Sequence, residues 1–302
     1  MESLEQLKTA FETVVGITVT PFTQSNEIDE IAYKSIVAQV SAAGITALTP
    51  NGNTSEFYSL SFAERIRSVE LTLEAARQDT LIIPGVGLDG ATAATEAQLY
   101  KEMGAHAVML HSPVHPFWST EGWINSHRDL AASVPGMPVV PYIKSAKITP
   151  SVIQKLLDTV PEVIAIKYAV PDVVQFAESV SLIGQERVTW ICGLAEMWAP
   201  FFAVAGATGF TSGLVSVDAP RSLRMLQALR EGDYTSAMSE QREIESFEML
   251  RARDDSQHNV TAVKEALEQL GLCSGAVRAP LSRLNAEDTE TVSQILTSWG
   301  KR

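Results

Sequence analysis

Hydrophobic residues in this chain gather in short runs that recur along its whole length. Eight runs rich in valine, isoleucine, leucine and alanine begin at Val14, Ile45, Leu81, His106, Pro138, Val163, Val188 and Ala207. Short continuous apolar runs bounded by turn signals are typical of strands that are buried on both faces, as in parallel sheets. The pattern therefore predicts eight buried strands.

The segments between these runs carry the spacing of amphipathic helices. We expect helices over Asp29–Ala43, Ser61–Arg77, Thr92–Met103 and Asp172–Ile183. Strand and helix alternating eight times is typical of a closed (β/α)8 TIM barrel, an α/β fold. An open doubly wound sheet is the alternative, and it is less favoured because no G-x-G-x-x-G follows the first strand.

Strand signals stop after Pro220, and only helical patterns follow. These patterns cover Ser222–Arg230, Tyr234–Arg253, Asn259–Gly271 and Ala286–Trp299. No low-complexity tract or charge block marks a second independent domain. We therefore predict a barrel with the catalytic site over residues 1–230 and a C-terminal helical extension over residues 231–302.

Composition narrows the classes of partner. The 302 residues are 45% hydrophobic and 20% charged, with a net charge of −13. Such a charge argues against nucleic acids and anionic membranes as partners, so an anionic substrate needs local donors. No apolar run approaches the ~20 residues that span a bilayer, and the first ten residues lack the apolar core of a signal peptide. Two cysteines, Cys192 and Cys273, suggest neither a disulfide framework nor a metal site. Because nothing here indicates export or an oxidising compartment, we expect a cytoplasmic protein.

A lysine ends the apolar run Val163–Lys167. Burial disfavours the charged form of a lysine and lowers its pKa, and a neutral amine can attack a carbonyl carbon to form a Schiff base. The alternative is a lysine whose stem packs on the sheet edge while its ammonium stays in water. Barrel active sites lie at the carboxyl ends of the strands, where Tyr142 ends the preceding predicted strand. An amine nucleophile beside a phenol that relays protons suits Schiff-base chemistry and favours the functional interpretation of Lys167.

These residues resemble the dihydrodipicolinate synthase / N-acetylneuraminate lyase family of class I, Schiff-base aldolases and dehydratases. Its G-x-T-G-E loop resembles Gly52–Glu56, its strand-5 tyrosine falls on Tyr142, and the lysine of its I-K pair falls on Lys167. Its strand-7 glycine falls on Gly193, and its G-x-x-S on Gly209 to Ser212. The resemblance implies a homo-oligomer, a dimer or tetramer. We expect no cofactor, and no metal, because no histidine, aspartate or glutamate cluster has ligand spacing and iminium chemistry needs no metal.

Roles follow from the resemblance for each matching position. Lys167 would form the Schiff base and Tyr142 would be the general acid and base. Thr54, with the backbone N–H groups of Asn53 and Thr54, would bind the substrate carboxylate, since such donors suit an oxyanion. Alternatively, Thr54 is a turn residue that bonds its own backbone. The remaining expected substrate-binding positions are Gly52, Gly193 and Ser212.

Three positions depart from the family pattern. Asn53 replaces a hydroxyl that relays protons to the tyrosine, and Lys147 replaces the synthase's arginine for the aldehyde's carboxylate. His115 replaces a second tyrosine that reaches into a neighbouring subunit's site. His115 has the pKa range of a proton shuttle, and a surface position between two prolines is the alternative. Lys147 with Lys144 would clamp a distal carboxylate, unless both are ordinary loop lysines.

We therefore predict a lyase that forms a Schiff base between Lys167 and pyruvate or a pyruvate-like 2-oxo acid, for aldol cleavage, condensation or dehydration. One alternative is a dehydratase like 5-dehydro-4-deoxyglucarate dehydratase, which the sequence from Gly52 to Leu60 resembles. Others are dihydrodipicolinate synthase itself and a non-catalytic barrel that only binds a 2-oxo acid. His111 also lies near the predicted rim, and the sequence suggests no role for it.

Overall fold

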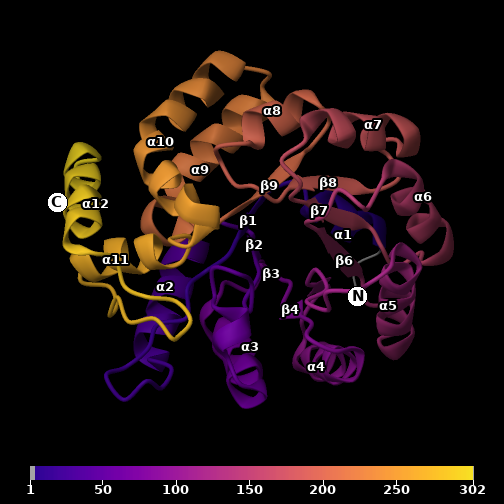
Figure 1. Ribbon diagram of the computed structural model, residues 1–302, viewed down its shortest axis with the longest axis horizontal. Helices are drawn as coiled ribbons and strands as arrows, with labels where there is room; N and C mark the ends of the chain where they lie inside the picture. The colour runs from indigo at the N-terminus through magenta and orange to yellow at the C-terminus, as the bar shows by residue number, and fades with distance from the viewer. Residues whose placement is uncertain (1–3, 302) are drawn as a thin grey trace. The chain divides into compact units, whose positions relative to one another are not determined.

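One sheet contains the strands of residues 4–301, which are the residues that the computed structural model describes. The strands follow one another in the order β3-β2-β1-β9-β8-β7-β6-β5-β4, and neighbouring pairs such as β6 and β7 are parallel (Figure 1). Their bounds are β1 (Val14–Gly16), β2 (Ala47–Leu48), β3 (Leu81–Ile82), β4 (Gly85–Val86), β5 (Val108–Leu110), β6 (Val139–Ile143), β7 (Ala165–Tyr168), β8 (Thr189–Cys192) and β9 (Gly209–Ser212).

The first and last strands of this order, β3 and β4, are two parts of one extended segment. Ile83 donates a hydrogen bond to the carbonyl of Leu48 in β2, and the carbonyl of Pro84 accepts one from Met109 of β5, each at 2.9 Å. Pro84 has no N–H to donate, so the ladder of hydrogen bonds is interrupted there and the segment divides into two short strands. The sheet thus closes on itself as a barrel of eight segments, and both the eight predicted strands and the (β/α)8 fold are confirmed.

Helices separate the strands along the chain, and helices alone follow the last strand. In the described residues they are α1 (Leu4–Ala10), α2 (Glu30–Ala42), α3 (Phe62–Ala75), α4 (Gly90–Met103), α5 (Thr120–Ser133), α6 (Pro150–Thr159), α7 (Val173–Ile183), α8 (Ala199–Val204), α9 (Val215–Arg230), α10 (Tyr234–Ser256), α11 (Thr261–Gln269) and α12 (Ala286–Ser298), with a short 3-10 helix, η1 (Phe57–Ser59). None of them has both the length and the apolarity to span a lipid bilayer.

Polar residues set the starts of most long helices. In seven helices the side chain before the first turn accepts a hydrogen bond from the backbone N–H three residues further on, which satisfies a donor that the helix leaves unpaired. These caps are Asp29, Ser61, Asp89, Ser119, Asp172, Asp233 and Asn285. They explain why the helix starts could be placed from the sequence to within a few residues.

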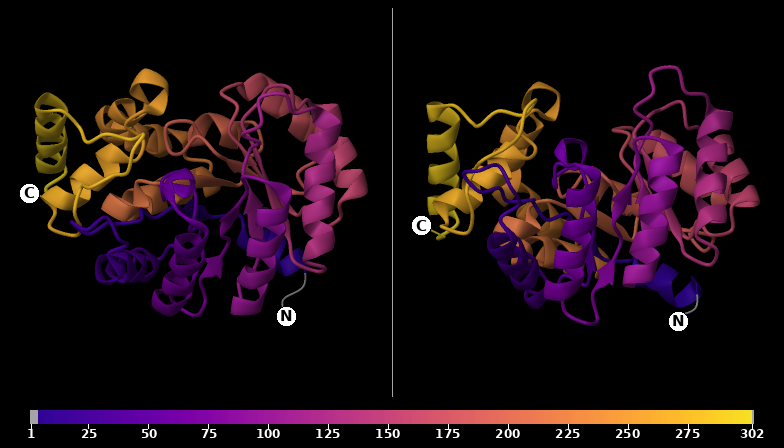
Figure 2. Two further views of the ribbon diagram at one scale, coloured as in Figure 1. Left: turned by 60° about the horizontal axis from the view of Figure 1, so that its bottom comes forward. Right: turned by 90° about the horizontal axis from the view of Figure 1, so that it is seen from below.

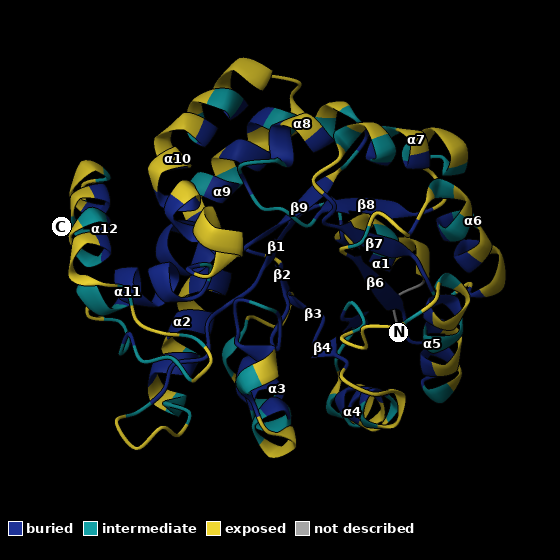
Figure 3. Cartoon of the chain, viewed as in Figure 1, coloured by how far each residue is buried: buried dark blue, intermediate teal, exposed yellow. Residues whose placement is uncertain are grey.

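The chain forms two compact units. Unit 1 comprises Met1–Val15, Thr46–Thr49 and Leu81–Thr211, and unit 2 comprises Gly16–Ile45, Pro50–Thr80 and Ser212–Arg302. Unit 1 holds α1, α4 to α8 and nearly all strand residues; its helices α4 to α7 lie outside strands β4 to β8 (Figure 1). These strands are buried throughout, whereas the helices expose their outer faces (Figure 3).

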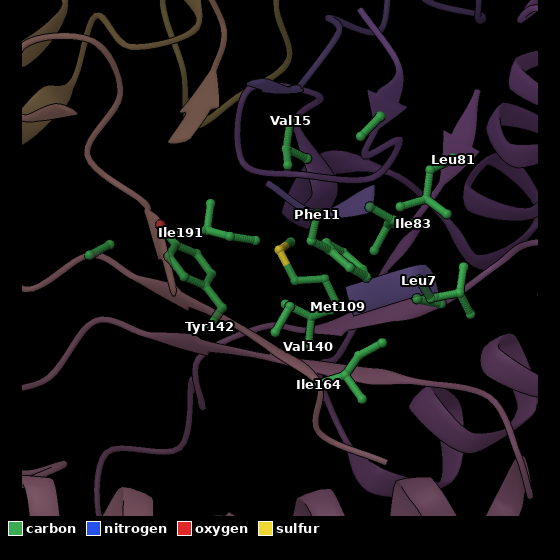
Figure 4. Packing of buried hydrophobic residues seen from close by; sticks show 14 residues of the cluster. Leu7, Phe11, Val15, Leu81, Ile83, Met109, Val140, Tyr142, Ile164 and Ile191 are labelled. Atoms are coloured by element: carbon green, nitrogen blue, oxygen red, sulfur yellow. The ribbon is translucent and has the colours of Figure 1, made fainter. Parts of the chain in front are cut away.

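The interior of unit 1 is packed with apolar side chains. Leu7 of α1 and Phe11 belong to one buried cluster with Met109 and Val140, and Figure 4 shows the side chains of the last three pointing toward one another. Figure 2 shows α1, drawn in indigo, at one end of this unit. The packed interior leaves the carboxyl ends of the strands as the place where polar groups gather.

Unit 2 is mainly helical and contains the C-terminal helices α10 to α12. Within it α9 packs against α2 and α10, and α11 packs against α12. Helix α10 leaves helical geometry at Arg253, where the predicted helix ends. The C-terminal helical part is thus present, while the proposed division of the chain at residue 230 stays a prediction.

Candidate active site

Lys167 lies on β7, in the interior of unit 1. Alternate residues of a strand point to the same face, and its neighbours at that spacing, Ala165 and Ala169, belong to the buried cluster. The lysine is only 3% exposed. A cavity of about 10 Å³ beside it is also lined by Phe11 and Met109, and this volume is the least that holds one water molecule. The structure therefore places the lysine away from bulk solvent, and the sheet-edge alternative is wrong.

The electrostatic surroundings favour the neutral form of Lys167. Burial, followed by the nearby positive charge of Lys144, lowers its pKa from the usual 10.5 to about 7. The thiol of Cys192 acts in the opposite direction, but burial raises the pKa of that thiol to about 12. Because Cys192 is then uncharged near neutral pH, it cannot offset the effect of burial on the lysine. Within residues 4–301, Lys167 forms no ion pair.

Tyr142 lies beside Lys167 on the neighbouring strand. The two residues are partners in the register of β6 and β7. The Nζ atom of Lys167 lies 4.0 Å from the centroid of the Tyr142 ring, and Nζ of Lys144 lies 5.9 Å from the same centroid. Two amines thus approach one aromatic ring, and the amine and the phenol that the sequence paired are brought together.

His111 extends this pair into a row of three residues. It follows β5, and the register of β5 with β6, continued by one residue, sets His111 beside Tyr142. The ring centroids of His111 and Tyr142 are 6.1 Å apart, with an angle of 65° between the planes, and His111 is only 4% exposed. The sequence analysis saw this histidine and assigned it no role. Its spacing of two residues from the apolar Met109 is the signal that could have placed it on the inner face.

Gly193 makes room for the stem of Lys167. A Cβ atom on Gly193 would lie 2.8 Å from Cβ of Ala169 and 3.0 Å from Cγ of Lys167. Real Cβ atoms rarely come this close, so a side chain at this position would crowd both Ala169 and the stem of Lys167. Gly193 therefore shapes the site by its lack of a side chain, which supports its place among the expected site residues.

The loop Gly52–Glu56 lies in unit 2 and is tied down on several sides. The hydroxyl of Ser55 donates to the carbonyl of Thr18 at 2.6 Å, and the Ser55 carbonyl accepts from the hydroxyl of Thr20 at 2.8 Å. Glu56 has a left-handed backbone and forms a fully buried ion pair with Lys264 of α11. These contacts hold the loop in one conformation, as a site for a small anion requires.

Thr54 and Ser212 also lie in unit 2. Thr54 is buried, and its Oγ1 would be 3.1 Å from a Cβ on Gly213. Ser212 ends β9, and its hydroxyl accepts a hydrogen bond from the backbone N–H of Val215, the first residue of α9, at 3.2 Å. Ser212 thus has a structural task at the start of α9, whether or not it contacts substrate.

His115 and Lys147 are both exposed. Nδ1 of His115 accepts a hydrogen bond from the backbone N–H of Phe117 at 3.1 Å, and Nζ of Lys147 lies 5.3 Å from the centroid of the Trp118 ring. Lys147 therefore lies against the segment that follows His115 in the chain, at the surface of unit 1. Neither residue is packed against Lys167 in the way that Tyr142 is, and the roles expected of them stay predictions.

Across residues 4–301, no group of three or more histidine, cysteine, aspartate or glutamate side chains is arranged to hold a metal ion. The groups gathered at the strand ends of unit 1 are an amine, a phenol and an imidazole. Such a set can add to a carbonyl carbon and move protons.

Comparison with known proteins gives one consistent result. The model of the dihydrodipicolinate synthetase family matches residues 10–299. The chain is 29% identical to a 4-hydroxy-tetrahydrodipicolinate synthase of Methanospirillum hungatei over 96% of this chain and 99% of that protein. It is also 29% identical to a probable 5-dehydro-4-deoxyglucarate dehydratase of Rhizobium rhizogenes, over 98% of each. The crystal structure of dihydrodipicolinate synthase from Oceanobacillus iheyensis superposes with a TM-score of 0.95 at 33% identity, covering 99% of this chain and 100% of that one.

Proposed function

The chain belongs to the dihydrodipicolinate synthetase family and is a lyase, and we propose that Lys167 gives it a Schiff-base mechanism on pyruvate or a pyruvate-like 2-oxo acid. One observation carries this proposal: a buried amine whose pKa is lowered to about 7 lies 4.0 Å from the ring of Tyr142. About half of such an amine is neutral at pH 7, more than about a thousand times the neutral fraction of an ordinary lysine.

The covalent step begins with the neutral amine. The Lys167 nitrogen attacks the ketone carbon, and a proton passes from nitrogen to oxygen to give a carbinolamine. Tyr142 then donates its phenolic proton to the leaving hydroxyl, which departs as water and leaves a positively charged iminium on Lys167. The phenolate so formed takes a proton from C3 of the bound acid, which restores the phenol and yields an enamine. The enamine can attack an aldehyde or expel a hydroxyl from the substrate's chain.

The substrate carboxylate is assigned to the loop in unit 2. We propose that the hydroxyl of Thr54, with the N–H groups of Asn53 and Thr54, binds it, while Gly52 lets the backbone approach and Ser212 completes the set. Hydrogen bonds anchor this loop through Ser55, which supports a preformed anion site. Neutral donors of this kind also suit a protein whose net charge is −13.

The parts of the substrate beyond the 2-oxo acid are assigned to the exposed groups. We propose that Lys147 binds a distal carboxylate and that His115 moves protons at the mouth of the site, in its own or a neighbouring subunit. Lys147 lies against Trp118, three residues after His115 in the chain, which supports a common role. We also propose that the protein forms a homo-oligomer in the cytoplasm. The chain would divide at residue 230 into the barrel and the C-terminal helical extension.

Two net reactions are candidates. One relative named as a synthase and one named as a probable dehydratase are each 29% identical to this chain. The sequence from Gly52 to Leu60 resembles that of the dehydratases and favours loss of water from a deoxy-keto sugar acid. Turnover of each substrate class, followed by product analysis, distinguishes the two.

Trapping with borohydride tests the common mechanism. The protein is incubated with pyruvate and a panel of 2-oxo acids, reduced, and weighed as an intact chain. We expect a covalent adduct with at least one acid, no adduct with Lys167→Met, and an unchanged adduct with the exposed control Lys101→Met. No adduct with any acid, or an adduct that persists in Lys167→Met, would overturn the proposal.

A further inference from the structure

A polar cavity lies in unit 2, next to the loop Gly52–Glu56. It has a volume of about 230 Å³, and its walls come from residues between 53 and 59, from residues between 256 and 260, and from Leu281. All of these residues belong to unit 2. A water molecule takes about 30 Å³ in the liquid, so the cavity has room for several water molecules or for a short hydroxylated chain.

The residues that line this cavity carry one charge, and that charge is balanced. Glu56 is the only ionisable acid or base among them apart from the phenol of Tyr58. Its side chain is fully buried and forms an ion pair with Lys264, and its Oε2 accepts a hydrogen bond from the backbone N–H of Arg278 at 3.2 Å. The cavity wall therefore offers no cation to a carboxylate or a phosphate, and no free carboxylate to an amine.

Three uncharged side chains give the wall its hydrogen-bonding groups. The hydroxyl of Ser59, the NH2 group of Asn259 and the carbonyl oxygen of Gln257 form no hydrogen bond within residues 4–301. The wall thus holds donors and acceptors that are not yet used. A hydroxyl group both donates and accepts, so it suits such a wall better than a group that only accepts.

A buried arginine orients one of these groups and links the cavity to Thr54. Nη2 of Arg251 donates to Oδ1 of Asn259 at 2.7 Å, and Nη1 donates to Oε1 of Glu248 at 2.6 Å. Because the amide is planar, its NH2 group is turned away from the guanidinium. A Cβ atom on Gly213 would lie 2.7 Å from Nη2 of Arg251 and 3.1 Å from Oγ1 of Thr54. The arginine therefore lies close to the residue assigned to the substrate carboxylate.

The second wall segment follows a strained turn at the end of α10. Asp254, Asp255 and Ser256 have φ angles of 50°, 57° and 67°, in the left-handed region that residues other than glycine rarely adopt. Nε2 of Gln257 donates to Oδ2 of Asp254 at 2.9 Å, and the backbone N–H of Asn259 donates to the carbonyl of Ser256 at 3.0 Å. Strained backbone of this kind clusters at active sites and ligand clamps. Here the turn brings Ser256 and Gln257 to the cavity wall.

We propose that this cavity binds hydroxyl groups on the substrate's chain, beyond the 2-oxo acid group. Ser59 and Asn259 donate to hydroxyl oxygens of the chain, and the carbonyl oxygen of Gln257 accepts from a hydroxyl. The ligand class is a polyhydroxylated 2-oxo acid. A plain acid of the same length leaves these polar groups without partners and binds less tightly. The inference rests on the proposed Schiff-base function and adds to it the residues that select the substrate's chain.

Two 2-oxo acids of equal chain length test this selection. 3-Deoxy-2-oxogluconate has hydroxyls along its chain, whereas 2-oxohexanoate has none. Each acid is equilibrated with the protein at a series of concentrations and reduced with borohydride. Intact mass then gives the fraction of chains with an adduct, including the pyruvate adduct that cleavage of the sugar acid leaves. The measured quantity is the half-saturating concentration of each acid.

Two cavity variants are compared with the native protein and with one control. Ser59→Ala removes a hydroxyl and leaves the backbone carbonyl that Arg278 binds. Asn259→Asp keeps an oxygen for Arg251 and replaces the NH2 group. Gln294→Glu, at an exposed position of α12 in the same unit, is the matched control for the added negative charge.

In both cavity variants we expect the half-saturating concentration to rise about five- to tenfold more for the hydroxylated acid than for 2-oxohexanoate. This is the effect of losing one hydrogen bond between uncharged groups. Gln294→Glu should shift both acids equally. Circular dichroism checks that each variant is folded, and Ser59→Ala, which leaves Arg251 untouched, keeps the test if Asn259→Asp does not fold.

The outcomes separate the inference from the proposed function. Cavity variants that shift both acids equally, or neither, would show that the cavity binds no hydroxyl and would overturn the inference. A native protein that forms an adduct with 2-oxohexanoate or pyruvate but none with the hydroxylated acid would also overturn it, while the Schiff-base function stands. If the native protein forms no adduct with any 2-oxo acid, the proposed function fails, and the inference fails with it.

Discussion

Replacing Lys167 with methionine should stabilise the folded protein at neutral pH, although it abolishes the proposed chemistry. Burial lowers the pKa of this lysine from 10.5 to about 7. Each pKa unit corresponds to about 1.4 kcal/mol, so the folded protein bears a cost of about 5 kcal/mol when Lys167 is charged in both states. Methionine has a similar length and no charge, and it removes this cost.

The sign of the pH dependence follows from the two pKa values. Below pH 7 the lysine is protonated in the folded and unfolded states, and the full cost is present. Between about pH 7 and 10.5 the unfolded state binds a proton that the folded state does not, so the stability of the native protein rises with pH. The advantage of Lys167→Met should therefore be largest below pH 7 and shrink by up to about 1.4 kcal/mol per pH unit above it.

Urea unfolding followed by circular dichroism measures this difference. Native protein, Lys167→Met and the exposed control Lys101→Met are compared at pH values from 6 to 9.5, at one protomer concentration so that any subunit association contributes equally. The control should follow the native protein at every pH. A stability difference between Lys167→Met and native protein that does not change with pH would refute the reasoning, because the lysine would then have the same pKa folded and unfolded.

Three further changes test other parts of the site. Lys144→Gln removes a positive charge that lowers the pKa of Lys167, so the pH midpoint of borohydride trapping should move upward; an unmoved midpoint would show that burial alone sets that pKa. Gly193→Ala places a Cβ 3.0 Å from Cγ of Lys167, and we expect at least a tenfold loss in trapping rate, with a rate near native contradicting the packing argument. Glu56→Gln leaves the ammonium of Lys264 buried without its partner and should lower the free energy of unfolding by about 3–5 kcal/mol, measured in urea; a loss below about 1 kcal/mol would mean that water reaches the pair.

Much of the fold could be predicted because local patterns decide it. The apolar runs marked the strands, since a strand covered on both faces has few polar positions. Capping residues such as Asp29 and Ser61 marked helix starts through their own backbone contacts. Helix α9 is the exception: it begins at Val215, before the predicted start at Ser222, and it runs through Pro220 across a kink at Asp218. The backbone leaves helical geometry at Asp218, two residues before Pro220, so the break that a proline suggests is present as a kink between two helical parts.

The site residues that could be predicted from the sequence are those whose polar side chains end an apolar run. Lys167 stood out because a charged residue ends an apolar run, and Tyr142 because it ends the run before it. His111 also ends an apolar run, but its place beside Tyr142 depends on the register between β5 and β6, which the sequence does not reveal. That Phe11, far away in the sequence, lines the small cavity beside Lys167 could not be predicted for the same reason.

The ring of Tyr142 under the lysine nitrogen bears on which ketones can react. A buried site that disfavours a lone ammonium also disfavours a lone iminium, because both carry one positive charge. The aromatic face 4.0 Å from Nζ offsets part of this cost, and the carboxylate of a 2-oxo acid balances the rest by making the bound adduct neutral as a whole. Simple ketones bring no such counter-charge. In the proposed Schiff-base mechanism, the same burial that favours the neutral amine would thus favour keto acids over plain ketones, before any part of the substrate's tail is recognised.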